Sequence, residues 1–295
     1  MEIKIYLCTC DPTAYILPAT IFLYKKFVKP CPVIKILGFS KPELPDWENV
    51  EFISLGEKQE SVNSWSTYIY DYLKTVDDKI IYFALDDFFP IDYFNNRCYD
   101  YVINYMGNNP VGFCAVGQVP SSSPERNEVE SVIHQTQDIF VYKRKKPVNY
   151  QLTLQPGIWN LDYLLKFLKI PSSPWMFESE STALANREDG YFNISTSNYP
   201  ISSPKCMFSF STQSSLSGKW PNKISVLGLR SEYVEELIDK NLIDKNKLII
   251  GAWDRYTDWT KEFNQDDLET LANSKGGTDW YALYKGGYPP LTPVE

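Results

Sequence analysis

An apolar run that ends in two adjacent carboxylates constrains the fold of this chain more than any other stretch. Residues 79–90 read KIIYFALDDFFP. Six or seven β-favouring residues, with charged residues before them and a proline after, are typical of a buried central strand. Asp86 and Asp87 then stand at the carboxyl end of that strand, the edge at which open α/β sheets bind ligands.

The two acids indicate a chemistry as well as a place. Adjacent carboxylates at a strand end are suited to holding a divalent cation against a phosphate-bearing substrate. The alternative is that Asp86 and Asp87 only cap a helix that starts near Ile91, since aspartate is a favoured N-cap residue.

Length and charge limit the classes of protein to consider. At 295 residues, the chain has room for a large core, either as one large domain or as a domain with an appended part. Its net charge of -8 and pI of about 4.9 argue against a nucleic-acid partner, because a phosphate backbone needs a basic face. The one cationic cluster, KRKK at 143–146, is expected in a solvated loop.

Cysteine usage and hydropathy are those expected of a cytoplasmic protein. The 6 cysteines are scattered and some lie in apolar runs, which favours reduced, packed thiols. A single histidine and the lack of a second cysteine pair at metal-site spacing argue against a structural zinc site. No apolar run reaches the length of about 18 residues that a membrane span needs, and the N-terminus enters a strand at once. We therefore expect no membrane span and no targeting segment.

Strand and helix patterns alternate in the first third of the chain. Strands are predicted at 3–7, 33–39 and 50–55, and helices at 13–28 and 61–76. This order predicts a mostly parallel sheet with covered faces, a Rossmann-like half. No G-x-G-x-x-G follows the first strand and no Walker phosphate loop is present, which disfavours a dehydrogenase and an ordinary ATPase or kinase.

The pattern changes beyond Pro90. Helices are predicted at 92–106, 161–168, 175–187, 231–240 and 265–273, and strands at 111–116, 137–142, 150–154, 191–195 and 206–210. The segments 137–142 and 150–154 are expected to form an antiparallel pair, and 155–160 a turn into a helix. We expect a main domain over residues 1–220 and a C-terminal extension, 221–295, packed on it.

The order of these pieces resembles the GT-A class of nucleotide-sugar glycosyltransferases, over roughly residues 1–210. The resemblance rests on the N-terminal βα units, Trp65 before the acidic strand, LDDFF at 85–89, QPGIW at 155–159 and SPWMFE at 173–178. The chain is similar to family 2 members of this class, with an xDD variant of the D-x-D motif in which Phe88 stands at the place of the second acid. The implied fold is a Rossmann-like GT-A sheet, mostly parallel, with a small antiparallel part and a C-terminal helical tail.

The resemblance implies an enzyme, a hexosyl- or pentosyltransferase that acts with inversion. Its donor would be a nucleotide-diphosphate sugar, and its acceptor a glycan, a glycoconjugate or another hydroxyl compound. Asp87 would hold Mn²⁺ or Mg²⁺, and Asp86 would reach the ribose or the water around the metal. The physical reason is that the leaving diphosphate gains charge, which a cation stabilises. A magnesium-like ion takes its remaining ligands from water and phosphate.

A base must remove the proton of the acceptor hydroxyl, and Glu178 is the candidate. In inverting members of the class, a carboxylate near a helix start at this point of the chain is the base, and PWMF at 174–177 is expected to desolvate it. The alternative is an acid placed there by the helix dipole. Glu180 is the reserve candidate, and His134, the sole imidazole, is expected to be structural or exposed.

Candidate donor contacts follow the first two strands and the turn before Trp159. Residues after the strands are Thr9, Cys10, Asp11, Gly38, Phe39 and Ser40, for which simple turn chemistry is the alternative. Trp65 lines the nucleotide pocket or packs on the sheet, and its helical spacing favours packing. Gln155 and Trp159 are candidates to hydrogen-bond and stack on a sugar. The segment 217–219 is a candidate loop over the diphosphate.

Two other functions fit parts of the pattern. A catalytically silent carbohydrate-binding protein would keep the fold and use its Trp and Tyr residues to hold glycans. A metal-dependent phosphohydrolase would use Asp86 and Asp87, but it lacks the further His and Asp ligands of a two-metal site.

Overall fold

A computed structural model gives the fold and describes residues 4–58, 61–116, 129–136, 139–196, 210–212, 224–225, 231–245 and 248–250. The chain divides into two units, Met1–Phe210 and Ser211–Glu295. The predicted helix at 265–273, the loop at 217–219 and most of the predicted strand at 206–210 lie outside the described residues.

The first unit begins with the predicted alternation of strands and helices. Its elements up to the acidic residues are β1 (Ile5–Cys8), the 3-10 helix η1 (Ala14–Ile16), α1 (Leu17–Phe27), β2 (Ile34–Gly38), β3 (Val50–Ser54), the 3-10 helix η2 (Val62–Ser64), α2 (Trp65–Leu73) and β4 (Ile80–Leu85). The helix predicted at 13–28 begins only at Leu17, because Pro18 fits the first turn of a helix and not its interior.

The remaining elements of this unit bring helices and strands of both directions. They are β5 (Phe88–Pro90), α3 (Asn96–Asn108), β6 (Val111–Ala115), β7 (Val129–Gln135), β8 (Phe140–Arg144), β9 (Gly157–Asn160), α4 (Leu161–Leu168), α5 (Pro174–Ala185), β10 (Phe192–Thr196) and, at the division, β11 (Phe210–Thr212).

One sheet of 9 strands organises the first unit, in the order β3-β2-β1-β4-β9-β6-β10-β8-β7. The four strands β3, β2, β1 and β4 are parallel, as are β6 and β10. The strands β9 and β8 run against their neighbours. The predicted α/β class, a mostly parallel sheet with a small antiparallel part, is therefore confirmed.

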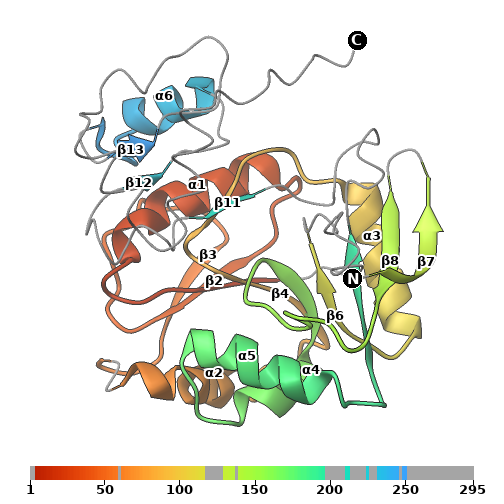
Figure 1. The fold of residues 1–295 in the computed structure, drawn as a ribbon. Helices are drawn as coiled ribbons and strands as arrows, with labels where there is room; N and C mark the ends of the chain where they lie inside the picture. The colour runs from red at the N-terminus through yellow and green to blue at the C-terminus, as the bar shows by residue number, and fades with distance from the viewer. Residues whose placement is uncertain are drawn as a thin grey trace. The chain divides into compact units, whose positions relative to one another are not determined.

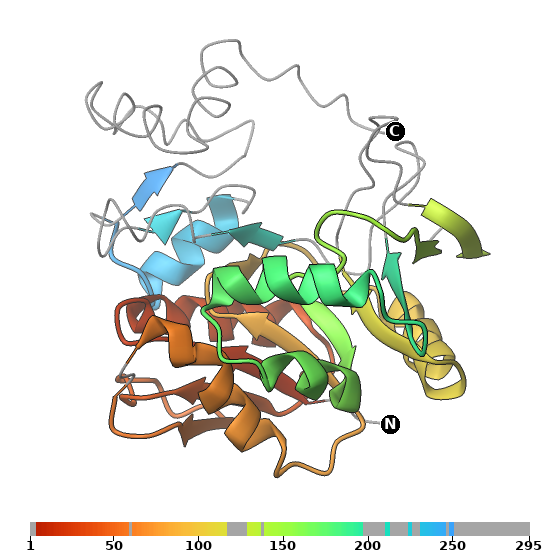
Figure 2. The same ribbon diagram turned by 60° about the horizontal axis from the view of Figure 1, so that its bottom comes forward.

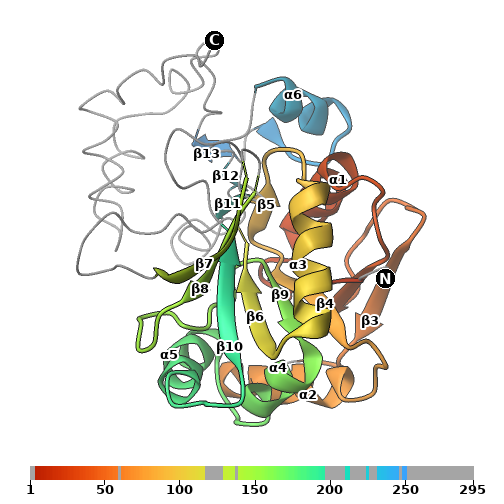
Figure 3. The same ribbon diagram turned by 90° about the vertical axis from the view of Figure 1, so that its right-hand side faces the viewer.

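Apolar side chains project from both faces of this sheet, so a hydrophobic core lies against each face. In β1, Ile5 and Leu7 point to one core and Tyr6 and Cys8 to the other, the alternation that a strand imposes. Helices α1 and α3 cover the first face, while α2, α4 and α5 cover the second. Figure 1 shows α1 and the α2–α4–α5 layer on opposite sides of the sheet, and Figure 3 shows α3 alongside β6.

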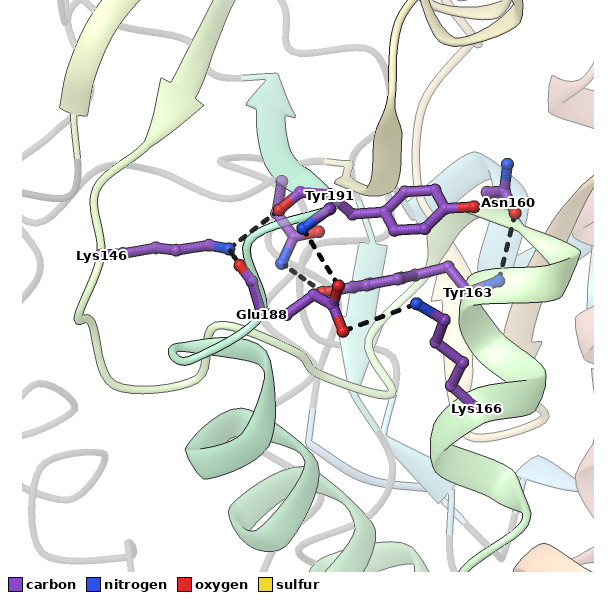
Figure 4. Close-up of polar contacts among 8 residues, drawn as sticks. Lys146, Asn160, Tyr163, Lys166, Glu188 and Tyr191 are labelled. Carbon is purple, nitrogen blue, oxygen red and sulfur yellow. Dashed lines mark hydrogen bonds and ion pairs between the residues drawn. The ribbon is translucent and has the colours of Figure 1, made fainter.

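Polar contacts connect the ends of the layer formed by α4 and α5, which lies toward the viewer in Figure 2. Lys146 donates to the backbone carbonyls of Glu188 and Tyr191, the latter at 2.9 Å (Figure 4). The Glu188 carboxylate lies 3.5 Å from the ammonium of Lys166, which sits 4.8 Å from the ring centroid of Tyr191. Partial burial lowers the pKa of Lys146. These contacts join the start of β10 to α4.

The second unit has its own small arrangement. Its described elements are β12 (Ile224–Ser225), α6 (Ser231–Asp239) and β13 (Leu248–Ile250), and β12 pairs with β13 in parallel. Helix α6 confirms the helix predicted at 231–240, and its buried residues Tyr233, Val234 and Leu237 recur at helical spacing. The packing of this unit on the first stays a prediction.

Two predictions between β8 and α4 were wrong. The segment 150–154 is not a strand, and β8 pairs instead with β7, ahead of it in the chain. The Pro-Gly pair at 156–157, a turn signal in sequence, begins β9, which inserts antiparallel between β4 and β6. A glycine is needed there because a Cβ on Gly157 would lie 2.3 Å from Cε2 of Phe113.

The cationic run at 143–146 was also misread as a solvated loop. Lys143 and Arg144 belong to β8, and Arg144 is 1% exposed. Its Nη1 donates to the backbone carbonyl of Gln151 at 3.1 Å. This hydrogen bond offsets part of the cost of burying the guanidinium group.

Gly157→Ala is expected to destabilise the sheet. The new methyl group meets the Phe113 ring at 2.3 Å and the backbone oxygen of Cys114 at 3.1 Å, so strands or ring must shift. Overpacking of this kind costs about 1–3 kcal/mol, which urea denaturation measures.

Gly107→Ala is the matched control. It lies in α3 with no atom within 4 Å of its added Cβ. Alanine there is expected to be neutral or to stabilise by up to about 1 kcal/mol. Equal effects of the two substitutions would contradict the packing argument.

Candidate functional site

The strand order reverses at one place in the sheet. From β1 the chain adds β2 and β3 on one side, and then crosses to place β4 on the other side. Ligands of doubly wound sheets bind outside the carboxyl ends of the strands at such a switch point. Cys8 and Leu85 are partners in the two strands, so the residues that follow them emerge side by side. These residues include Thr9, Asp86 and Asp87.

Asp86 is the most tightly held side chain at this edge. It is 4% exposed, and its Oδ2 accepts hydrogen bonds from Oγ1 of Thr9 at 2.5 Å and of Thr13 at 2.8 Å. Its backbone N–H donates to Cys8, and its carbonyl accepts from Thr20 at 2.8 Å. The carboxylate therefore joins the end of β4 to the end of β1 and the start of the following helix.

The environment of Asp86 brings its protonation close to neutral pH. Burial raises the pKa of this carboxyl from 3.8 to about 6, against the opposing effect of the hydrogen bonds from Thr9 and Thr13. A bound cation, or a hydroxyl that donates to the carboxylate, would lower this pKa and favour the charged form of Asp86.

Asp87 lies beside it and is 8% exposed. Burial raises the pKa of the Cys10 thiol, and the charges of Asp86 and Asp87 raise it further. Both carboxylates are therefore near the end of β1. Phe88, where a D-x-D motif has its second acid, is a buried residue of β5. The helix-capping alternative is wrong, because Asn95 caps α3 by accepting from the Cys98 N–H at 3.1 Å.

The predicted contacts after β1 and β2 also lie together. The backbone N–H and Oγ of Ser40 donate to the two oxygens of Asp11, each at 3.0 Å, and both residues are exposed. Gly38 stands against Thr9, because a Cβ at Gly38 would lie 2.6 Å from Cγ2 of that threonine. The switch point thus brings Thr9, Cys10, Asp11, Gly38 and Ser40 to one edge.

Glu178 comes to the same edge by another route. β9 is antiparallel to β4, with Gly157 opposite Phe83, so the segment before β9 lies at the carboxyl end of β4. Glu178 holds this segment, since its Oε1 accepts from Oγ1 of Thr153 and from the N–H of Leu154, both at 2.7 Å. Gln155, the next residue, is half-buried there.

The start of α5 confirms this placement. Ser66 and Ser172 exchange hydrogen bonds, at 3.1 Å from the Ser66 N–H and at 2.8 Å from the Ser172 N–H. Ser66 is in the first turn of α2, which follows β3, so it lies at the carboxyl edge of the parallel strands. The first turn of α5 is therefore at that edge too.

The structure corrects the predicted surroundings of Glu178. Trp175 is 72% exposed and Met176 is 40% exposed, so they do not enclose the carboxylate, and only Phe177 is buried. Ser179 and Glu180, which follow Glu178, are exposed as well, while Glu178 itself is half-buried.

The tryptophans expected near the donor belong to the core. Trp159 is fully buried, with its ring 4.1 Å from that of Phe113, so its faces are covered by protein and offer nothing to a sugar. Trp65 is 8% exposed and meets the ring of Phe177 at 5.8 Å, the packing role that its helical spacing favours. His134 stacks on Tyr101 at 4.2 Å, a structural role.

The sequence patterns did not predict two threonines that hydrogen-bond to Asp86. Thr13 and Thr20 both bond to Asp86, 73 and 66 residues away along the chain. Their only sequence signal is their position at the start of the helix that follows β1. Thr153, which bonds to Glu178, gave no signal at all.

Few side chains at the Asp86–Asp87 edge are available to bind a divalent cation. The described residues hold no group of three or more His, Cys, Asp or Glu side chains that could bind a metal. Asp86 also directs one oxygen at Thr9 and Thr13. A cation here would therefore take Asp87, with or without Asp86, and complete its shell from water and substrate phosphates, as Mg²⁺ does.

In the described part of the chain, the cysteines are free thiols: Cys8, Cys10, Cys31, Cys98 and Cys114. No helix in the described ranges combines the length and the hydropathy needed to cross a membrane.

Comparisons with known proteins give weak matches. Neither a protein-family model nor a curated protein matches the sequence. Among solved structures, the chain is similar to the mannosyltransferase PcManGT from Pyrobaculum calidifontis in complex with GDP-Man and Mn²⁺, with 10% identity, a TM-score of 0.44, and 67% of this chain and 55% of that chain covered. It is also similar to S. aureus TarS 1-349, with 14% identity, a TM-score of 0.40, and 74% of this chain and 62% of that chain covered.

A third similar structure is a cytidylyltransferase from Leptospira borgpetersenii serovar Hardjo-bovis, with 16% identity, a TM-score of 0.41, and coverage of 82% of this chain and 95% of that chain. The chain spans less than two thirds of the length of the first two structures.

The buried carboxyl of Asp86 predicts a pH dependence of stability. Because its pKa is raised in the folded state, from 3.8 to about 6, the native protein binds a proton that the unfolded chain releases at lower pH. Stability contributed by this group is present below about pH 4 and is lost as the pH rises to about 6. The loss is at most about 3 kcal/mol, from about 1.4 kcal/mol for each pKa unit.

Asp86→Asn isolates this effect, because its side-chain oxygen still accepts from Thr9 and Thr13. The free energy of unfolding of both proteins is measured by urea denaturation with EDTA at pH 4, 5, 6 and 7. The value for the variant, relative to that for the native protein, should rise up to about pH 6 and stay constant above it. A constant difference across this range would contradict the raised pKa.

Proposed function

We propose that this chain is a glycosyltransferase of the GT-A type, which moves a sugar from a nucleotide-diphosphate donor to a hydroxyl of a glycan or glycoconjugate acceptor. The observation that carries the proposal is the pair Asp86–Asp87 at the switch point of the sheet, with the Glu178 carboxylate on the same edge. An electrophile bound between the two acidic groups would meet a cation site on one side and a base on the other.

The donor would lie along the ends of β1, β2 and β4. Thr9, Cys10 and Asp11 with Gly38 and Ser40 form the wall available to the nucleoside. Asp86 would accept from a ribose hydroxyl, and its pKa near 6 would allow it to do so as a carboxylate at neutral pH. Asp87 would face the diphosphate through a cation, which as a Lewis acid offsets the charge of the leaving group.

Glu178 would act as the base. One of its oxygens, Oε1, is engaged by Thr153 and Leu154, which fixes the orientation of the carboxylate. Within the described residues Oε2 makes no hydrogen bond, so it can accept the acceptor proton. As the acceptor oxygen bonds to the anomeric carbon, the bond from that carbon to the diphosphate breaks, the diphosphate keeps the electron pair, and the acceptor proton moves to Oε2. Attack opposite the leaving group inverts the anomeric centre.

Binding of the donor nucleotide tests the acidic pair. Titration calorimetry with UDP, GDP and CDP in Mn²⁺, Mg²⁺ or EDTA should find at least one nucleotide that binds, followed by release of nucleoside diphosphate from the matching nucleotide sugars. Asp87→Ala is expected to abolish cation-dependent binding. Asp71→Ala, which removes an exposed acid of α2, should not change it. Binding that is unaffected by Asp87→Ala would overturn the assignment.

Glu178→Gln tests the base separately. Glutamine keeps an oxygen for Thr153 and Leu154 but cannot take the proton, so transfer should fall by a factor of about 10² to 10⁴ while nucleotide affinity is kept. The measurement is the rate of sugar transfer at saturating donor. Glu180→Gln, on the exposed side of α5, is the control, and a fall confined to Glu180→Gln would move the role to that residue.

The second candidate, a carbohydrate-binding protein without catalysis, is favoured by one observation, the exposed indole of Trp175. A glycan that raises the melting temperature where no nucleotide does would support this reading over the enzyme.

A further inference from the structure

Trp175 stands apart from the other aromatic side chains described at this edge. Its side chain is 72% exposed, whereas Trp65, Trp159 and Phe177 are buried in the core below it. A single exposed apolar side chain is ordinary on a protein surface. What makes this one informative is its position relative to Glu178.

Helix geometry places Trp175 beside Glu178. Three residues along a helix amount to a rotation of about 60° from the starting direction and a rise of about 4.5 Å. Side chains at that spacing are neighbours on the helix surface. Met176, in the same turn, is also exposed, but two residues before Glu178 it points about 160° away. Trp175 therefore flanks the carboxylate, and Met176 does not.

The contacts of α5 show which way this flank faces. Asn186 bonds to Val148, Thr182 to Leu152, and Glu178 to Leu154, so the segment 148–154 runs antiparallel along the helix. Moving from Glu178 to Trp175 therefore continues toward Gln155, at the carboxyl end of β4. Helical side chains also lean toward the helix N-terminus, which carries the indole further in that direction.

We propose that Trp175 is the platform on which a pyranose ring of the acceptor stacks while Glu178 takes the proton from one of its hydroxyls. This inference rests on the proposed function and names the residue that would hold the acceptor sugar. The indole presents a flat apolar face, and a pyranose with equatorial hydroxyls presents a matching face of C–H groups. The same stacking leaves the ring hydroxyls at its rim, next to the carboxylate.

A fluorine label makes the platform visible without knowledge of the acceptor. The chain has 8 tryptophans, so 5-fluorotryptophan labelling gives a small set of ¹⁹F resonances, and the one that disappears in Trp175→Phe is assigned to Trp175. Methyl β-glucopyranoside, methyl β-galactopyranoside, cellobiose and maltose are then titrated into the full chain. At least one should shift that resonance with saturation, and Trp175→Ala should weaken its binding at least tenfold.

Met176→Ala is the matched control, because it removes an exposed apolar side chain from the same turn on the other side of Glu178. It should bind the same sugar as the native protein does. The thermal unfolding of Trp175→Ala should be unchanged, since the indole is exposed, which separates lost binding from lost folding. Equal losses in the two variants would overturn the platform.

The nucleotide titration on the same samples separates the two proposals. If a nucleoside diphosphate binds and no sugar moves the Trp175 resonance, the platform is overturned and the transferase stands. If a sugar moves it and no nucleotide binds, the platform holds and the transferase is overturned in favour of the silent carbohydrate-binding protein. If neither binds, both are overturned.

Discussion

The buried carboxyl group of Asp86 is the interaction on which the arrangement of this site depends. Placing a carboxyl group out of water is costly unless its oxygens receive hydrogen bonds. Here the hydroxyls of Thr9 and Thr13 supply them, and Thr20 bonds to the backbone carbonyl of the same residue. These contacts fasten the ends of β1 and β4 together at the switch point, so Asp87, one residue further, is held at the same edge. A loop without such contacts would leave both acids to the solvent.

The other side of the edge is built by an inserted strand. β9 enters the parallel sheet in the opposite direction, which turns the segment 152–156 toward the carboxyl ends of its neighbours. Glu178 then bonds to Thr153 and Leu154 and orients its carboxylate by the same contact. The segment that Glu178 holds in place thus also fixes the orientation of the Glu178 carboxylate, the candidate base. This explains how residues 87 and 178, remote in the chain, come to one edge of the sheet.

The sequence predicted the parts of this site that local patterns encode. An apolar run ending in Asp86 and Asp87 identifies both a buried strand and its carboxyl end, because strand burial and sheet direction follow from residue order. It did not predict Thr13 as a partner of Asp86, since a hydrogen bond across 73 residues leaves no periodic trace. It also misread Gly157, whose role as the close contact of Phe113 depends on a neighbouring strand and looks like a turn in isolation. Arg144 was misplaced for the same reason, because only the fold brings the Gln151 carbonyl to its guanidinium.

Trp159, expected to stack on a sugar, and Trp175, expected to help enclose Glu178, show what decides such roles. Trp159 follows the turn signal Pro-Gly and precedes a helix, yet the insertion of β9 between two strands buries its side chain completely. Trp175 was read as part of an apolar frame, yet the helix buries only the stripe of Phe177, Ser181 and Ala185, which leaves Trp175 outside. The indole that is open to a ligand at this edge is therefore that of Trp175, on the solvent side, and not that of Trp159 in the core. In the proposed transferase, the donor would be held against the strand ends and a carbohydrate acceptor would approach from solvent, where an exposed indole can meet it.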